Sequence, residues 1–279
     1  MKNPLVTLLL SFWCFALVGL TVANSAHAEQ IAGRDVIISD QRGSFAGPAP
    51  LIVALHPNGS SPRQFRKSSQ LDRAARDIGA IVIYPPAPAG WQIGTNGDVA
   101  FLRAVITGLQ RDPRIAAFPA LILGHGQGGA MALHFACEAP DMVAGLGIVS
   151  TKLPRSFRCA RGPARPAMFI HGTADPIQAH DGDTDHLSAT QTVATWAKRN
   201  GCSDAVRIRK IDQNKRDKTS VVSRRYTACR AVLEHLQILG GGHGWPTGAA
   251  RKSSSLGPQT GEIAASPALV TFLAPLVRR

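Results

Sequence analysis

Short apolar runs alternate with amphipathic segments along the chain. The runs are continuous, which is typical of strands buried on both faces of a parallel sheet. Five of them predict strands, at residues 51–55, 80–84, 121–123, 146–149 and 167–170. Apolar residues recur at helical spacing between them, at 62–78, at 98–109 with Asp98 as the expected N-cap, at 129–138 and at 188–199. Strands alternating with helices predict a right-handed, doubly wound α/β fold with a mostly parallel sheet.

Two later segments differ from this alternation. Residues 205–238 alternate β-favouring and basic residues, which predicts extended chain at one edge of the sheet. Residues 248–261 are rich in Ser, Thr and Gly and are expected to form a surface loop. No linker divides residues 29–279, and a chain of 279 residues with 44% hydrophobic content is ordinary for one packed domain.

The N-terminal segment has the pattern of a signal peptide. Lys2 precedes an apolar stretch at 5–22, and Ala26-His27-Ala28 is a small-x-small cleavage site. The alternative is a membrane anchor, which is disfavoured because the stretch is interrupted at Thr7, Ser11 and Gly19. We therefore expect residues 1–28 to be removed and the remaining chain to be secreted or periplasmic, with no membrane span.

Export changes how the cysteines are interpreted. An even number in an oxidising compartment predicts two disulfides among Cys137, Cys159, Cys202 and Cys229. Three pairings are possible, of which nearest-in-sequence pairing is favoured. No Cys-x-x-Cys spacing supports a zinc site. The acidic positions between His180 and His186 resemble a calcium loop, but the bidentate glutamate is missing, so we expect a solvated loop and no metal.

A glycine-rich turn follows the strand at 121–123. The segment Gly124-His-Gly126-Gln127-Gly128 opens a helix, so it could cradle a phosphate or present a nucleophile. Nucleotide binding is disfavoured, since neither the dinucleotide spacing nor a Walker lysine is present. Asp175 follows the strand at 167–170, and His243 lies in a glycine-rich loop near the end of the chain. This order is that of α/β hydrolases.

On these segments the sequence resembles exported esterases of the polyhydroxybutyrate depolymerase and feruloyl esterase type. The resemblance covers most of residues 29–279 through motifs at 51–56, 98–102, 136–140, 171–176, 199–202 and 241–246. It implies a single α/β-hydrolase domain that needs no cofactor. It further implies hydrolysis of carboxylic esters by a Ser-His-Asp triad, with Asp175 as the acid and His243 as the base.

The sequence departs from the family at the centre of this site. The nucleophilic serine aligns with Gly126, which has no hydroxyl to acylate, so we expect impaired catalysis. His125 is expected to point into the fold. The oxyanion hole would use the backbone N–H of Gln127 and a second one near residue 57, where Pro57 has none to offer. Asn58 is the candidate donor, and whether position 57 or 58 donates stays open.

Other features leave the ligand open. Trp91 and Trp245 stand in loops where they could stack a sugar, a phenolic ring or a polyester, or could cover the core. The chain has a net charge of +13, and its positive residues are concentrated at 198–230. This segment is expected to form a solvated face or a face attracted to anionic envelope polymers. Few aromatic residues accompany these cations, which argues against nucleic acid. An impaired esterase that still binds an ester or glycan is favoured over an active esterase with an unconventional route and over a basic envelope-binding scaffold.

Overall fold

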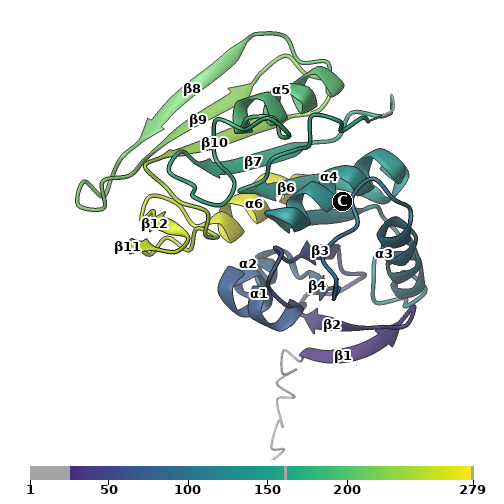
Figure 1. Ribbon diagram of the computed structural model, residues 1–279. Helices are drawn as coiled ribbons and strands as arrows, with labels where there is room; N and C mark the ends of the chain where they lie inside the picture. Colours follow the sequence, from purple (N-terminus) through teal and green to yellow (C-terminus); the bar gives the residue numbers. More distant parts are fainter. Residues whose placement is uncertain (1–25, 160–161, 278–279) are drawn as a thin grey trace, which may run out of the picture.

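The computed structural model describes residues 26–159 and 162–277 (Figure 1). The predicted signal peptide lies outside these residues except for Ala26–Ala28. These three residues are exposed and form the first half of strand β1 (Ala26–Ile31).

A ten-stranded sheet forms the centre of the domain, in the order β1-β2-β4-β3-β5-β6-β7-β10-β9-β8. The six strands from β4 to β10 in this order run parallel, whereas β1, β2, β9 and β8 pair antiparallel at the two edges. The remaining strand bounds are β2 (Arg34–Asp40), β3 (Leu51–Leu55), β4 (Ile81–Tyr84), β5 (Ala120–His125), β6 (Val143–Val149), β7 (Ala167–Gly172), β8 (Val206–Ile211), β9 (Ser220–Tyr226) and β10 (Leu233–Leu239). The expected mostly parallel sheet with an extended edge segment is confirmed.

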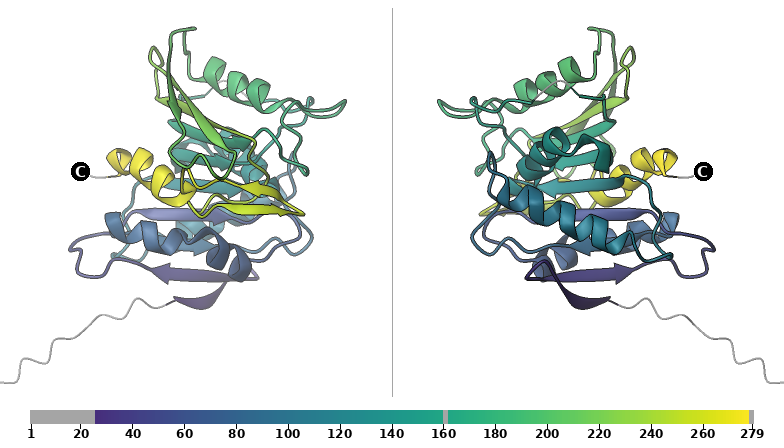
Figure 2. Two further views of the ribbon diagram at one scale, coloured as in Figure 1. Left: turned by 90° about the vertical axis from the view of Figure 1, so that its left-hand side faces the viewer. Right: turned by 90° about the vertical axis from the view of Figure 1, so that its right-hand side faces the viewer.

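Helices cover both faces of the sheet (Figures 1 and 2). One core lies under α3 (Gly97–Leu109), α4 (Gln127–Glu138) and α5 (Ala189–Arg199). The other lies under α1 (Pro62–Ser69), α2 (Leu71–Ala75) and α6 (Ala265–Leu273). Residues of β3 alternate between the two cores, with Val53 in the first and Ile52 in the second, so every position of this strand is buried. This is why its apolar run is continuous.

Three details differ from the sequence expectations. The helix expected at 62–78 is broken at Gln70, which has a φ of 54° and separates α1 from α2. Asp98 lies inside the first turn of α3 and not at its N-cap, since its carboxylate accepts a hydrogen bond from Gln92 N and pairs with Arg34. The expected surface loop at 248–261 contains a hairpin of β11 (Arg251–Ser254) and β12 (Gly257–Gln259).

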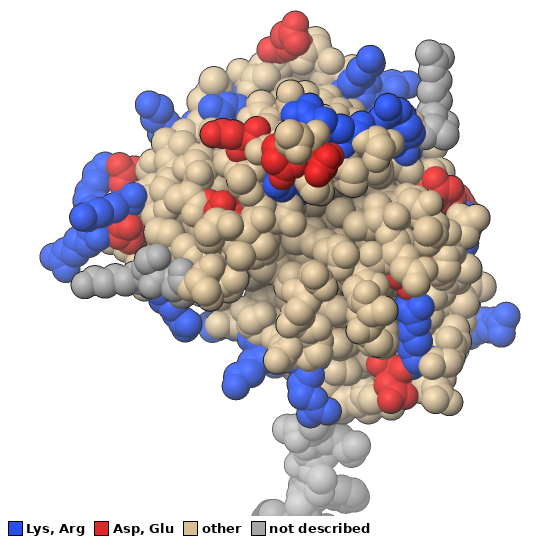
Figure 3. Space-filling model, viewed as in Figure 1, with Lys and Arg blue, Asp and Glu red and all other residues tan. Residues whose placement is uncertain are grey.

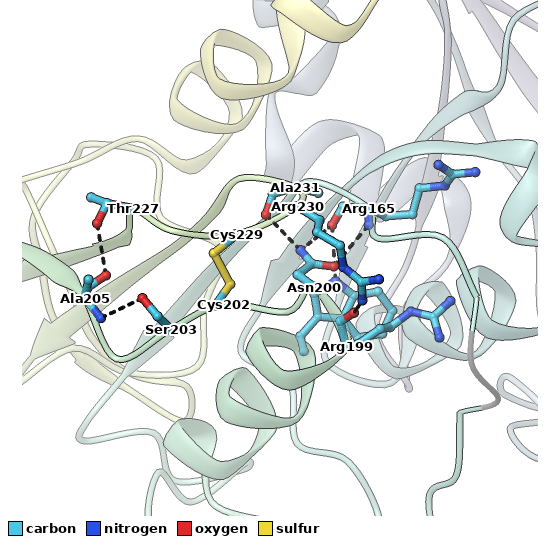
Figure 4. The surroundings of a disulfide bond; sticks show 11 residues. Arg165, Arg199, Asn200, Cys202, Ser203, Ala205, Thr227, Cys229, Arg230 and Ala231 are labelled. Carbon is cyan, nitrogen blue, oxygen red and sulfur yellow. Dashed lines mark hydrogen bonds between the residues drawn. A yellow bond between two sulfur atoms is a disulfide. The ribbon is translucent and has the colours of Figure 1, made fainter.

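Two disulfides join Cys137 to Cys159 and Cys202 to Cys229, the nearest-in-sequence pairing. Figure 4 shows the second, which links the end of α5 to the segment before β10. Beside it, the Asn200 side-chain amide donates to the carbonyl oxygens of Arg165 and Ala231. Within the described ranges, no helix is long and apolar enough to cross a membrane.

Candidate active site

The glycine-rich turn connects β5 to α4 at the carboxyl end of the sheet. Gly126 has φ 54° and ψ −119°, a conformation that favours glycine. Its N–H donates to Val149 O at 2.9 Å, and its carbonyl accepts the Thr151 hydroxyl at 3.0 Å. The end of β6 therefore fixes both the N–H and the carbonyl of Gly126.

The flanking glycines are required by close packing, whereas Gly126 is not. A Cβ on Gly124 would lie 2.3 Å from Gly128 O, and one on Gly128 would lie 2.2 Å from Leu55 O. Real Cβ atoms do not approach backbone so closely. A Cβ on Gly126 would have its nearest neighbours at 3.4 Å, one of them Nε2 of His243. A side chain at this position would thus fit and would point toward the histidine.

Asp175 and His243 meet at this turn. Nδ1 of His243 lies 2.9 Å from Oδ2 of Asp175, and both side chains are buried. The other oxygen, Oδ1, accepts the N–H groups of Ile177 and Gln178. Burial raises the pKa of Asp175, but the hydrogen bonds from His243 and the backbone outweigh it, so the pKa lies below its usual value. The carboxylate stays charged and holds His243 with Nε2 facing Gly126.

His125 packs beneath the site, as its place before Gly126 suggests. Its ring is buried among Phe65, Trp245 and His243. Burial lowers the pKa of His125 to about 3, so the ring is neutral. A neutral buried ring hydrogen-bonded to the His243 backbone is a structural residue and not a substitute nucleophile.

The β11–β12 hairpin supports the histidine loop, a role the composition of residues 248–261 does not reveal. The N–H groups of Gly242 and His243 donate to Pro258 O at 2.7 Å and Leu256 O at 2.6 Å. A Cβ on Gly242 would lie 2.2 Å from Leu256 O, so this contact needs glycine. The segment 248–261, which was expected to be a surface loop, therefore helps to position the backbone of His243.

The candidate oxyanion-hole residues lie around Gly126. Gln127 is the first residue of α4, where backbone N–H groups have no partner within the helix. Pro57 and Asn58 both line the adjoining cleft, and the Pro57 side chain would touch a Cβ on Gly126. The Gln127 side chain accepts a hydrogen bond from Trp91 N at 3.0 Å, which ties the helix start to the loop after β4.

The two tryptophans cover the core and do not line the cleft. Trp91 is 3% exposed and donates its indole N–H to His56 O, and its ring packs on His56. Trp245 is 5% exposed and donates to the Ser266 hydroxyl while it packs against Phe65. The substrate-stacking interpretation of both residues is therefore corrected, because their faces are already occupied.

A cleft of about 310 Å³ opens at Gly126. Its lining combines backbone turns with polar and apolar side chains, namely Pro57, Asn58, Ile93, Gly126, Gln127, Ala130, Lys152, Pro154, Ile177, Gln178, His186 and His243. The space-filling view shows a hollow near the middle of this face, with acidic and basic side chains above it (Figure 3). The volume is that of a site for a small ligand or one end of a larger one.

The acidic loop between His180 and His186 closes on itself. The carboxylate of Asp183 accepts hydrogen bonds from Lys152 Nζ, from His186 Nδ1 and from the backbone N–H groups of Asp185 and His186. The Lys152 and His186 hydrogen bonds hold the pKa of Asp183 well below its usual range. No cluster of three metal-ligating side chains occurs in the part of the chain that the structure describes.

The basic segment is divided between the faces of the sheet. Arg224 and Arg225 are neighbours in β9, so they point to opposite sides. Arg224 bonds Gln237, while Arg225 lies near Glu234. The density of cations along the sequence thus overstates the charge on any one face.

The chain is similar in sequence or in fold to several known esterases. No family model matches the chain. It is 28% identical over 231 residues to "Putative esterase NocK" of Nocardia uniformis subsp. tsuyamanensis, a match covering 71% of this chain and 66% of that protein. It is 26% identical to feruloyl esterase B of Piromyces equi over 61% of this chain and 36% of that protein, and 26% identical to feruloyl esterase C of Emericella nidulans over 85% of each.

The chain thus spans about two thirds of the first of these relatives and about a third of the second. Among solved structures, acetyl xylan esterase from Aspergillus awamori superposes with a TM-score of 0.60 at 14% identity, over 79% of this chain and 94% of that one. The chain therefore has the α/β-hydrolase fold, and its sequence is similar to those of esterases.

Proposed function

We propose that this protein is an exported member of the carboxylic ester hydrolases that binds an ester in the cleft above Gly126 and hydrolyses it poorly. One observation carries the proposal: Asp175 and His243 are arranged as the acid and base of a triad, and His243 Nε2 lies 3.4 Å from the Cβ position of a residue that has no side chain. The machinery for activating a hydroxyl surrounds a position that lacks one.

The chemistry follows from the roles of the three positions. With a serine at position 126, His243 would take the hydroxyl proton as the oxygen attacks the ester carbonyl, and would return it to the leaving alcohol. The N–H of Gln127, with Asn58 as the candidate second donor, would stabilise the oxyanion. Without the nucleophile only binding and oxyanion stabilisation remain, which corresponds to a loss on the order of a millionfold in a well-studied serine protease.

Sequence features and relatives support the location and ligand class. The signal-peptide pattern at 1–28 and the two disulfides favour an exported protein in an oxidising compartment. Relatives named as feruloyl esterases, and a structural neighbour named as an acetyl xylan esterase, favour a feruloyl or acetyl ester such as one on a polysaccharide.

The test is a reversion at position 126. The mature chain and its Gly126→Ser and Gly126→Ala variants are assayed with p-nitrophenyl butyrate. We expect turnover to rise by several orders of magnitude in Gly126→Ser only, and to be lost again in the double variant Gly126→Ser/His243→Ala. Native turnover far above that of Gly126→Ala would contradict impairment and favour an unconventional route, such as activation of water by His243.

A further inference from the structure

The described lining of the cleft contains one lysine and no arginine. Among the described residues that line it, Lys152 is the only lysine or arginine, and none is an aspartate or glutamate. The carboxylate of Asp175 lies behind His243, with a side chain that is fully buried. Lys152 is therefore the lining residue that can serve as the cationic partner of an anionic group on a ligand.

Lys152 is held rigidly at this position. The residue is 7% exposed, and its Nζ donates to Oδ2 of Asp183 at 2.7 Å. The other oxygen of Asp183 is bonded to the backbone N–H groups of Asp185 and His186 and to His186 Nδ1. Because these donors share the charge of Asp183, it neutralises Lys152 less than a dedicated partner would. An ammonium group has three N–H donors, and Asp183 occupies one of them.

Lys152 and the reacting position Gly126 line the same cleft although they are far apart in sequence. Lys152 follows Thr151, whose hydroxyl bonds the carbonyl of Gly126. Lys152 and Gly126 both line the 310 Å³ cleft. A small molecule can therefore place a carbonyl at Gly126 and a second group at Lys152 in the same bound state.

We propose that this cleft selects esters that carry a carboxylate a short chain away from the ester carbonyl, and that Lys152 is the residue that recognises the carboxylate. This inference rests on the proposed function and adds the substrate class. A carboxylate gains a charge-assisted hydrogen bond from a buried ammonium group, whereas a neutral ester oxygen gains a weaker one. The same contact would hold the free acid alone, so the test must separate the two.

The test uses matched pairs of ligands with the mature native chain. Monomethyl esters of succinic, glutaric and adipic acid are titrated by ligand-observed NMR beside the corresponding dimethyl esters, which differ by one methyl group. Butyrate provides a carboxylate without an ester. We expect at least one monomethyl ester to bind about tenfold more tightly than both its dimethyl ester and butyrate, a difference of about 1.4 kcal/mol.

Variants assign the preference to Lys152. Lys152→Met should remove it, whereas Lys210→Met, which removes a charge from an exposed position of β8, should leave it unchanged. Asp183→Asn removes the competing carboxylate and should increase the preference severalfold. Should Lys152→Met fail to fold, the native chain still gives an answer, since a preference based on charge weakens as salt is raised.

Separate outcomes address the two proposals. Equal binding of monomethyl and dimethyl esters, or a preference that survives Lys152→Met, would overturn this inference and leave the proposed function standing. Binding of butyrate as tight as that of the best monomethyl ester would overturn it in favour of a site for free acids. If no ester binds and Gly126→Ser also gains no turnover, the proposed function itself fails.

Discussion

The rings of His125 and His243 stack with centroids 4.8 Å apart, and Nε2 of His125 lies 2.8 Å from the carbonyl oxygen of His243. Because the buried His125 ring is neutral, its Nε2–H donates to that carbonyl. The strand that leads into the nucleophile turn is thus bonded directly to the loop that carries the base. The relative position of Gly126 and His243 depends on this contact.

Replacing His125 by leucine should loosen the site. The change leaves the His243 carbonyl without its donor in a buried place, which costs about 1–3 kcal/mol of unfolding free energy in urea titrations. In a Gly126→Ser background it should also lower kcat. His134→Leu is the control, since His134 is another buried histidine whose Nε2 bonds a carbonyl, that of Thr95. That variant should lose stability and keep its kcat, and an equal loss of kcat in both would contradict a specific role for His125.

Stability should decrease as the pH falls below neutrality. Burial lowers the pKa values of His125 and His235 from 6.5 to about 3 in the folded chain. Between these two pH values the unfolded chain binds more protons than the folded chain. The stability that depends on keeping these histidines neutral is therefore fully present above about pH 6.5 and is lost as the pH falls toward 3. The slope should approach about 1.4 kcal/mol per pH unit for each histidine. Urea unfolding at pH 7.5 and 5.5 measures this pH dependence of stability. His235→Leu should reduce the slope, and an unchanged slope would contradict an origin in the buried histidines.

The reversion Gly126→Ser should cost stability while it creates activity. Space is available, but the φ of 54° strains any residue with a Cβ, by about 1–3 kcal/mol. Gly126→Ala should pay a similar amount without gaining turnover, which separates strain from chemistry. Urea titration of both variants is the measurement. A serine variant as stable as the native chain would contradict a strained turn.

The support given by the β11–β12 hairpin can be tested at Gly242. Gly242→Ala places a Cβ 2.2 Å from Leu256 O, so the hairpin or the histidine loop must move. In the Gly126→Ser background we expect kcat to fall by at least tenfold. Gly108→Ala provides the comparison, because a Cβ at this position of α3 meets no atom within 4 Å and should stabilise the helix by about 0.5–1 kcal/mol. Unaltered kcat in Gly242→Ala would mean that His243 is positioned without the hairpin.

Each disulfide should contribute similarly to stability. The bridged cysteines are 22 and 27 positions apart, so loop closure predicts about 3 kcal/mol for each. The paired variants Cys137→Ser/Cys159→Ser and Cys202→Ser/Cys229→Ser, compared by urea unfolding, measure the two terms. A decrease of less than 1 kcal/mol in the free energy of unfolding of either double variant would contradict stabilisation through loop closure in the unfolded chain.

The parts of the fold that could be predicted are those governed by local pattern. The sequence predicts strand β3 because all of its residues are buried and form one apolar run. It does not predict the helix break at Gln70, because the helical periodicity continues across that residue. The approach of Asp175 to His243 follows from the chain order of the motifs. The burial of Trp91 and Trp245 depends on partners such as His56 and Phe65 that are distant in sequence, so loop position alone left their role open.

The glycines on either side of position 126 have a wider consequence. Gly124 and Gly128 are fixed by the backbone atoms packed against them, so the architecture of the turn survives whether or not a reactive group stands between them. A side chain at position 126 therefore changes the chemistry at the cost of local backbone strain, while the packing around the turn stays the same. One substitution at this turn can thus add or remove the reactive group within an unchanged architecture.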